Sequence, residues 1–247
     1  MEDIQDKLQN DKFSREDARY LAKRREVAEL IGIENLWEIV DQFALYSGVQ
    51  TLATRLAGFE IIKQALKVPG HFFEFGCWQG ANLMFISKVL QLLEPNSHRH
   101  VYGFDSFEGL QTFSKADGAD ATKLRGSYMG NEDRLRTLIR FFEMDEWVHL
   151  VKGDALTTIS EFEESNQHVM AAFAYIDFDL YEPCMAALKF LEKRLVPGGV
   201  IAFDEAFMNA WPGEGRALRE FLENNPGKYT SHTVQFARQP TVYLIRK

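Results

Sequence analysis

The sequence predicts an α/β fold in which a seven-stranded, mostly parallel sheet lies between two layers of helices. From residue 71 onward, short apolar runs rich in β-branched and aromatic residues alternate five times with segments of helical length. Five such repeats imply right-handed crossovers that place helices on both faces of one sheet. Two further apolar runs near the carboxyl end are separated by Ala237–Pro240, which is long enough only for a hairpin, so the sheet closes with one antiparallel strand.

Each element follows from its own residues. Residues 14 to about 68 are predicted to be helical, and the first helix begins at Ser14, whose Ser-x-x-Asp pattern is a fair N-cap. The third helix stops before Pro69-Gly70. The three early helices are predicted over residues 14–30, 34–46 and 49–67. The strands are predicted over residues 71–75, 100–106, 147–154, 171–179, 199–206, 229–236 and 241–247. The helices of the repeats are predicted over residues 80–93, 131–143, 156–165, 182–195 and 214–225. We therefore expect an N-terminal helical cap over residues 1–68 and a ligand-binding domain over residues 69–247.

Composition and charge narrow the kind of protein. A chain of 247 residues can bury one large core, with or without a helical appendage. Its net charge of −8, with no basic run longer than Lys23-Arg24-Arg25, argues against a nucleic-acid partner, because such binding needs positive charge. No apolar run reaches the ~18 residues of a membrane span, the acidic N-terminus is no signal peptide, and two cysteines are too few for a disulfide scaffold. We expect a cytoplasmic protein with a small-molecule partner and no membrane partner.

The most informative stretch follows the first predicted strand, where Glu74, Gly76 and Gly80 form the pattern E-x-G-x-x-x-G. It differs from the G-x-G-x-x-G of nicotinamide and flavin enzymes, whose third glycine lets the helix pack close to the strand. Here two glycines let the backbone turn sharply and approach a ligand, and Glu74 adds an acceptor. S-adenosylmethionine has no phosphate and carries a cationic amino group, so this loop suits it better than it suits NAD. The alternative is a tight strand-to-helix turn in some other α/β protein.

Acidic residues also end the next two predicted strands. In a doubly wound sheet the ligand lies across the carboxyl ends of the strands. Asp105 is therefore placed to accept hydrogen bonds from ribose hydroxyls, and Asp154 to accept one from the adenine amino group. Trp78 and Phe107 are candidates to pack against the cofactor, or else are ordinary rim aromatics. Each acid taken singly is more often an N-cap or a solvated loop residue, but acids at three successive strand ends favour a cofactor site.

A second group of acids ends the fourth and fifth predicted strands. Asp177 and Asp179 are two positions apart and point to the same face, and the adjacent pair Asp204-Glu205 ends the neighbouring strand. Carboxylates that converge without a cation repel one another and lose solvation, whereas Mg²⁺ prefers oxygen ligands and keeps positions open for a substrate. We therefore predict Asp177, Asp204 and Glu205 as ligands of Mg²⁺ or another divalent cation, with Asp177 and Asp179 as the catalytic residues. N-capping is the alternative, above all for Asp179, which could also hold a cofactor group.

Two segments flank this predicted site. The stretch 109–130 is polar, glycine-bearing and long for a loop, so it is either a lid or a disordered insertion. In the third predicted helix, Thr51 and Arg55 are placed to fold over the methionine end of the cofactor, where Arg55 could pair with its carboxylate. An amphipathic cap or a dimer face is the alternative interpretation of the N-terminal helices. Trp211 is a candidate wall of the acceptor pocket.

These residues resemble the macrocin and mycinamicin type of sugar O-methyltransferase. The likeness lies in FEFGCWQGAN, VYGFDSFEGL and the block from Asp177 to Glu205, and it covers about residues 47–210. It implies a Rossmann-like class I methyltransferase fold, S-adenosylmethionine, Mg²⁺ and a deoxysugar acceptor on a natural product. It also implies that Asp177, Asp204 and Glu205 bind the metal. Residues 69–247 are then the S-adenosylmethionine-binding methyltransferase domain.

The matching motifs add Asn82 and Ser106 to the residues expected to bind the cofactor, and the sequence departs from the family pattern in two places. Glu205 replaces the usual second Asp of the acidic pair, and the longer side chain would change or loosen the metal site. Gln79 stands where the family has Arg. No histidine lies between residues 108 and 148, a region where relatives place a candidate base. The base is therefore left open between a carboxylate, with Asp179 preferred, and a water.

Three other functions compete with a sugar O-methyltransferase. A metal-dependent O-methyltransferase of catechol-like phenols would use the same residues on an aromatic diol. A non-catalytic S-adenosylmethionine-binding protein would have no use for the second group of acids. A NAD-dependent oxidoreductase needs the third glycine of its fingerprint, which is missing here. The sequence does not determine the acceptor or the oligomeric state, for which a homo-oligomer is one option.

Overall fold

The computed structural model describes residue 18 and residues 40–247 of the chain. The predicted first helix, apart from residue 18, and residues 34–39 of the second therefore lie outside the described residues. The described end of the second helix contains α4 (Phe43–Tyr46), and α5 (Val49–Ala65) follows after Gly48.

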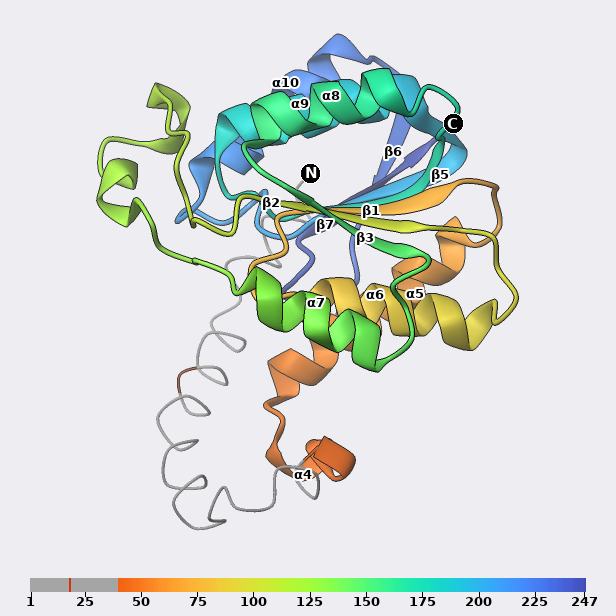
Figure 1. Ribbon diagram of the computed structural model, residues 1–247. Helices are drawn as coiled ribbons and strands as arrows, with labels where there is room; N and C mark the ends of the chain where they lie inside the picture. The colour runs from red at the N-terminus through yellow and green to blue at the C-terminus, as the bar shows by residue number, and fades with distance from the viewer. Residues whose placement is uncertain (1–17, 19–39) are drawn as a thin grey trace.

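A seven-stranded sheet runs through the described part of the chain (Figure 1). Its strands are β1 (His71–Phe75), β2 (Val101–Asp105), β3 (Val148–Lys152), β4 (Ala171–Ile176), β5 (Leu195–Phe203), β6 (Tyr229–His232) and β7 (Val242–Arg246). They lie in the order β3-β2-β1-β4-β5-β7-β6. The strands from β3 to β5 pair in parallel, and β7 pairs antiparallel with both β5 and β6. The strand order reverses beside β1, so the loops after β1 and β4 diverge and leave room for a ligand at their carboxyl ends.

Two layers of helices cover the sheet (Figure 1). One layer holds α5 with α6 (Ala81–Leu93) and α7 (Glu132–Phe141), and the other holds α8 (Ala155–Ser165), α9 (Tyr181–Arg194) and α10 (Pro212–Asn224). Successive side chains of a strand point to opposite faces. Accordingly Phe73 and Phe75 join the core beneath α8 and α9, and Phe72 joins the core on the α5 and α6 side. Burial on both faces explains why β1 is almost continuously apolar.

The predicted fold class is confirmed. Each predicted strand and each helix of the repeats is present, and β7 is the single antiparallel strand of the sheet that the described residues form. β5 begins at Leu195, ahead of the predicted start at residue 199, because Leu195 already pairs with Ala171 before a shift in register. Pro197, which precedes the predicted strand, lies within this irregular start of β5.

The segment between β2 and α7 extends beyond the carboxyl edge of the sheet (Figure 1). It holds two short 3-10 helices, η2 (Lys115–Asp117) and η3 (Ala121–Leu124). Two backbone hydrogen bonds join its two arms. Leu110 N–H donates to the Ser127 carbonyl oxygen at 3.0 Å, and Gly126 N–H donates to the Leu110 carbonyl oxygen at 2.9 Å. The predicted lid, residues 109–130, therefore has internal hydrogen bonds of its own.

The helix α5 belongs to one layer of the sandwich. It packs against α6, β4 and β5, and Ile61, Ile62 and Ala65 contribute to the core on that face. The division into a cap over residues 1–68 and a domain over residues 69–247 stays a prediction. Within the described ranges, no helix combines the length and the apolar character needed to span a bilayer.

Three histidines meet at the amino-terminal edge of the sheet. His71 Nδ1 accepts a hydrogen bond from the His100 backbone N–H at 2.9 Å, and His100 Nδ1 lies 2.7 Å from His149 Nε2. Burial, followed by the charges of His100, His168 and Arg99, lowers the pKa of His71 to about 4.

We expect the free energy of unfolding to fall as the pH drops from 6.5 to about 4. Over that range the unfolded chain binds a proton that the folded His71 does not, so acid favours unfolding. His71→Asn keeps an acceptor near the Nδ1 position but cannot titrate. Its free energy of unfolding, measured by urea titration across this pH range, should vary less with pH than that of the wild type. An equal pH dependence in the two proteins would contradict the role given to His71.

Candidate active site

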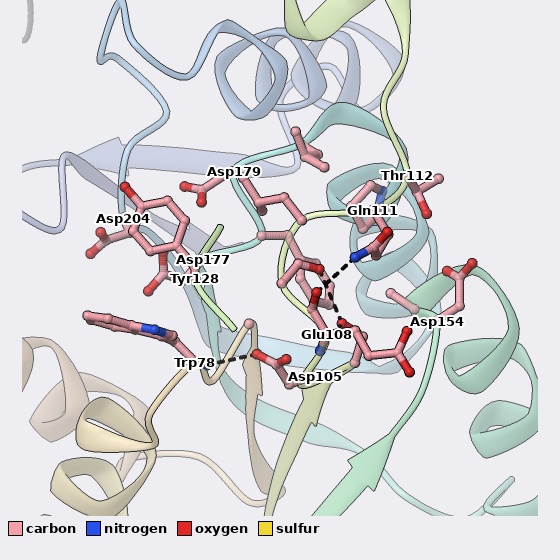
Figure 2. Close-up of a pocket in the computed structure, with 18 of the residues that line it drawn as sticks. Trp78, Asp105, Glu108, Gln111, Thr112, Tyr128, Asp154, Asp177, Asp179 and Asp204 are labelled. Carbon is pink, nitrogen blue, oxygen red and sulfur yellow. Dashed lines mark hydrogen bonds between the residues drawn. The ribbon is translucent and has the colours of Figure 1, made fainter. Parts of the chain in front are cut away.

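A cavity of about 550 Å³ opens at the carboxyl ends of the parallel strands. Its volume lies within the usual range for a small-molecule site. Figure 2 shows acids on two sides of it, with Asp105 and Asp154 on one side and Asp177, Asp179 and Asp204 on the other. The predicted site residues that line the cavity are Gly76, Trp78, Asp105, Ser106, Asp154, Asp177, Asp179, Asp204 and Glu205.

The turn after β1 brings two strand ends into close contact. Gly76 has a φ of +97°, and a Cβ there would lie 1.9 Å from the Asp177 carbonyl oxygen, so only glycine fits beside the chain that follows β4. Gly80 precedes α6 with a φ of +81°, and a Cβ there would lie 2.2 Å from the Leu135 side chain. Close packing therefore requires both predicted glycines, and Gly76 also lines the cavity.

Asp105 organises the loop that follows β1. Its Oδ2 accepts hydrogen bonds from the backbone N–H groups of Cys77 and Trp78, both at 2.7 Å, and its Oδ1 accepts one from Phe107 N–H at 2.6 Å. A carboxylate can accept about four hydrogen bonds. Asp105 therefore fixes the loop and still has acceptor capacity for a ligand in the cavity that it lines.

Asp154 and Ser106 border the same side of the cavity. Asp154 Oδ1 accepts a hydrogen bond from Leu156 N–H at 2.9 Å, so this residue is the N-cap of α8, the alternative that the sequence left open. Ser106 Oγ accepts one from Glu108 N–H at 3.1 Å and lies 3.3 Å from the Gly109 carbonyl oxygen, which holds the start of the lid. Both residues thus support the backbone around the cavity as well as lining it.

Glu74 lies behind the turn after β1 and does not line the cavity. It is fully buried, and its Oε1 accepts a hydrogen bond from Asn82 Nδ2 at 2.8 Å, while Asn82 Oδ1 accepts one from Arg55 at 2.7 Å. Burial raises the pKa of Glu74 to about 8, against the opposing effects of Asn82, Cys77 and Arg55. Glu74 Oε2 has no hydrogen-bond partner within the described part of the chain. A cationic amino group of a ligand would satisfy such an oxygen.

The other predicted cofactor residues also lie outside the cavity lining. Phe107 is buried in the core with a φ of +59°, so it is neither a rim aromatic nor a wall of the cavity. Thr51 is exposed on α5, and Arg55 lies over the Phe85 ring in addition to its bond to Asn82. Direct contact between these residues and a cofactor stays a prediction.

Four carboxylates converge where β4 and β5 end. Asp204 Oδ1 accepts a hydrogen bond from the Tyr175 hydroxyl, and Gln239 Nε2 donates to both Asp204 Oδ2 (2.6 Å) and Glu205 Oε1 (3.0 Å). Asp179 has a φ of +62°, and the nearby charge of Glu205 raises the pKa of its carboxyl. Asp179 does not cap α9, whose N-cap is the next residue along the chain. The acids that the sequence grouped together are therefore brought together by the fold.

Burial raises the pKa of all four carboxyls, and repulsion by neighbouring acids raises it further for Asp177, Asp179 and Glu205. Burial is the largest cause for all four; the charge of Asp204 comes next for Asp177 and Glu205, and the charge of Glu205 comes next for Asp179. The pKa of Glu205 reaches about 7. The group therefore carries less negative charge than four carboxylates in water. A nearby cation would lower these pKa values and favour the ionised forms.

Glu214, in the first turn of α10, is a fifth acid that the sequence did not single out. Its side chain is fully buried, its Oε1 accepts a hydrogen bond from Glu205 N–H at 3.0 Å, and its Oε2 has no partner among the residues described. Burial, followed by the charge of Asp204, raises the pKa of Glu214 well above its ordinary value. No sequence signal marks it, because a glutamate in the first turn of a helix is usually a surface residue that complements the helix dipole.

Aromatic side chains border the acids. The Trp78 and Tyr128 rings meet edge to face with centroids 5.7 Å apart, and the Tyr128 and Trp211 rings do so at 5.9 Å. Tyr128 comes from the lid and lies beside Asp177 and Asp204 in Figure 2. Trp211 packs against Tyr128 and does not line the cavity itself. An aromatic wall next to carboxylates suits a ligand with one apolar face and one hydroxylated edge.

The predicted metal ligands fit a divalent cation by donor type but are not arranged around one. Over residues 18 and 40–247, no three His, Cys, Asp or Glu side chains have the arrangement of a metal site. Asp204 and Glu205 accept hydrogen bonds from Gln239 instead. Carboxylate oxygens are nevertheless the ligands that Mg²⁺ prefers, and Glu205 Oε2 is buried without a hydrogen-bond partner among the described residues.

The strand order, the glycine turn after β1 and the acids at successive strand ends are those of the class I methyltransferase fold. A family model described as macrocin-O-methyltransferase (TylF) matches residues 49–230. This match spans most of the chain, and the protein belongs to the macrocin-O-methyltransferase family.

Known relatives agree with this assignment. The 8-demethyl-8-(2,3-dimethoxy-alpha-L-rhamnosyl)-tetracenomycin-C 4'-O-methyltransferase of Streptomyces olivaceus is 28% identical over 168 residues, which are 66% of this chain and 60% of the relative. The match thus spans less than two thirds of that relative's length. The crystal structure of CalS11, calicheamicin methyltransferase, has a TM-score of 0.80 at 25% identity and covers 94% of this chain and 92% of its own. An apo structure of CalS11, described as a TDP-rhamnose 3'-O-methyltransferase, has a TM-score of 0.72 at 25% identity, with 93% of each chain covered.

We expect Glu74→Gln to stabilise the ligand-free protein and to weaken cofactor binding. The folded chain keeps Glu74 protonated up to a pH of about 8, whereas its ordinary pKa is 4.5, so its burial costs more stability as the pH rises through this range. Glutamine keeps the acceptor for Asn82 and removes the titration, which should add at least about 1 kcal/mol to the free energy of unfolding near neutral pH. Urea titration measures the stability, and calorimetry with S-adenosylhomocysteine measures the binding.

A matched control is Glu60→Gln on α5, where the glutamate side chain is 52% exposed. This change should alter neither quantity. A Glu74→Gln protein that is less stable than the wild type at a pH of about 8, or that binds S-adenosylhomocysteine equally well, would contradict the account of Glu74.

Proposed function

We propose that this protein is an S-adenosylmethionine-dependent O-methyltransferase that methylates a sugar hydroxyl of a glycosylated natural product, with the help of a divalent cation. The observation that carries the proposal is one cavity in which the glycine turn after β1 faces the acids after β4 and β5 (Figure 2). The family supports the reaction class. The two relatives named above support a sugar acceptor, since one is described as acting on a rhamnosyl-tetracenomycin and the other on TDP-rhamnose.

The cofactor side of the cavity would bind and orient the methyl donor. Bound S-adenosylmethionine supplies a methyl group made electrophilic by the positive charge on sulfur. Asp105, held by three backbone N–H donors, offers its remaining acceptor capacity to ribose hydroxyls. The unpartnered oxygen of Glu74 suits the amino group of the methionine end. Rigid placement matters because alignment of the reacting atoms is the main source of rate in such a transfer.

The acceptor side would hold a hydroxyl and accept its proton. Asp177, Asp204 and Glu205 are partly accessible and would hold Mg²⁺ or another divalent cation through their oxygens. Such an ion, when bound, favours ionisation of a coordinated hydroxyl and fixes its orientation. Asp179 lines the cavity next to Glu205 and is the residue that we propose to take the proton, directly or through a water. Glu205 Oε2, which has no hydrogen-bond partner among the described residues, would gain one in such an ion.

We expect methyl transfer to rhamnosides and other deoxysugar glycosides, with kcat/KM at least about tenfold higher than for catechols. A puckered sugar ring can rest on Tyr128 while its hydroxyls reach the acids beside that ring. Release of S-adenosylhomocysteine, followed with a panel of both acceptor types, measures the preference. A preference for catechols would favour a phenol O-methyltransferase. Tight cofactor binding without turnover of any acceptor would favour a non-catalytic binding protein.

The same assay tests the cation. EDTA should abolish transfer, and added Mg²⁺ should restore it. Asp204→Asn should lower kcat at least about 100-fold, because the charge stabilisation supplied by a bound ion is worth several kcal/mol, and should leave the affinity for S-adenosylhomocysteine unchanged. Glu182→Gln, exposed on α9, is the control. Full turnover in chelator would contradict the metal part of the proposal and leave the methyltransferase part standing.

A further inference from the structure

A buried carboxylate in the lid takes part in none of the steps above. Asp117, at the end of η2, is only 6% exposed, although much of the lid is exposed. Its Oδ2 accepts hydrogen bonds from the N–H (2.6 Å) and the hydroxyl (2.9 Å) of Ser114, which close η2 as a capping box. Its Oδ1 accepts one from Tyr181 N–H at 2.6 Å, across 64 residues of sequence.

The helix α9 receives its cap through this contact. Its N-cap residue is Leu180, which has no side-chain acceptor, and α9 has no side-chain cap hydrogen bond from the residues next to it. The N–H of Tyr181 is one of the first four in the helix, which have no partner within it. Asp117 accepts from this N–H, so the lid supplies a cap that the chain next to α9 does not.

The start of α10 leaves room for the same carboxylate. A Cβ on Gly213 would lie 2.0 Å from Asp117 Oδ1 and 2.7 Å from the Tyr181 nitrogen. Gly213 is buried in the first turn of α10, and its φ is not positive. A larger residue is therefore excluded by contact with the neighbouring atoms and not by the backbone conformation. Three segments that are far apart in the sequence thus meet at one carboxylate.

We propose that Asp117 is a positioning residue that docks the lid over the cavity and fixes the loop that carries Asp177 and Asp179. The lid brings Tyr128 to the cavity wall, so its place decides the shape of the acceptor side. Asp179 lies two residues before Tyr181, and the hydrogen bond to Tyr181 therefore limits where that acid can move. The activity readout below rests on the proposed function, whereas the docking itself does not.

The test begins with Asp117→Ala, which removes the capping box and the bond to Tyr181 together. We expect kcat/KM for a rhamnoside to fall about threefold to thirtyfold, the range that loss of a helix cap implies, chiefly through a higher acceptor KM. The dissociation constant of S-adenosylhomocysteine should change less than about twofold. Trypsin should cut the lid, at the exposed Lys115, Lys123 and Arg125, at least about five times faster than in the wild type.

Two further variants isolate the contact. Gly213→Ala leaves Asp117 in place and introduces a residue that helices favour, but its methyl group collides with the carboxylate, so it should reproduce both changes. Asp120→Asn alters an acid of the same lid whose side chain is 81% exposed, and it should produce neither. If Asp117→Ala fails to fold, Asp117→Asn, which keeps one accepting oxygen, and Gly213→Ala carry the test.

Wild-type rates of both tryptic cleavage and acceptor methylation in Asp117→Ala and Gly213→Ala would overturn the proposal. Faster cleavage together with a raised acceptor KM in both variants would support it. A wild type that methylates no glycoside would instead count against the proposed function, and the cleavage rates would then decide the role of Asp117 alone.

Discussion

Mutual repulsion among the carboxylates grouped after β4 and β5 is the constraint on which the rest of this structure depends. The parallel strands β4 and β5 end side by side, and acids follow both of them. Burial disfavours their ionised forms, and each charge raises the pKa of its neighbours. Well-packed apolar residues at these positions would often be more stable. The divalent cation that we propose would reduce this repulsion and offset its cost to stability.

The two sides of the cavity use their acids in different ways. Asp105 accepts from three backbone N–H groups, so it fixes the turn that receives the cofactor. On the other side, Glu205 and Glu214 each keep a buried oxygen without a partner among the described residues. Unsatisfied buried oxygens cost stability, and a bound ligand that satisfies them recovers it. Glu74 Oε2, behind the turn after β1, is likewise buried without a partner among the described residues, so such oxygens lie near both sides of the cavity.

The sequence was sufficient to predict the fold and the convergence of the acids. Alternating apolar runs and helices predicted the sheet, and acids placed after neighbouring parallel strands must meet at one edge, which predicted the grouping of Asp177 with Asp204. It was not sufficient for contacts between distant segments, such as those of Asp117 with Tyr181 and of Gln239 with Glu205, because such pairs leave no periodic signal. The sequence also could not predict local backbone geometry. Phe107 has a positive φ and is buried in the core, whereas the sequence predicted that its side chain would contact the cofactor or lie at the rim of the cavity.

Thermal unfolding of Asp177→Asn beside the wild type, in chelator and in Mn²⁺, tests the central claim most directly. Asparagine keeps the shape of the side chain and removes one acid from the repelling group, so the variant should melt at the higher temperature in chelator. In saturating Mn²⁺ the order should reverse, because binding to the folded state stabilises most the chain that keeps all its ligands. A wild type that is already the more stable protein in chelator, or an equal response of both proteins to Mn²⁺, would contradict the account.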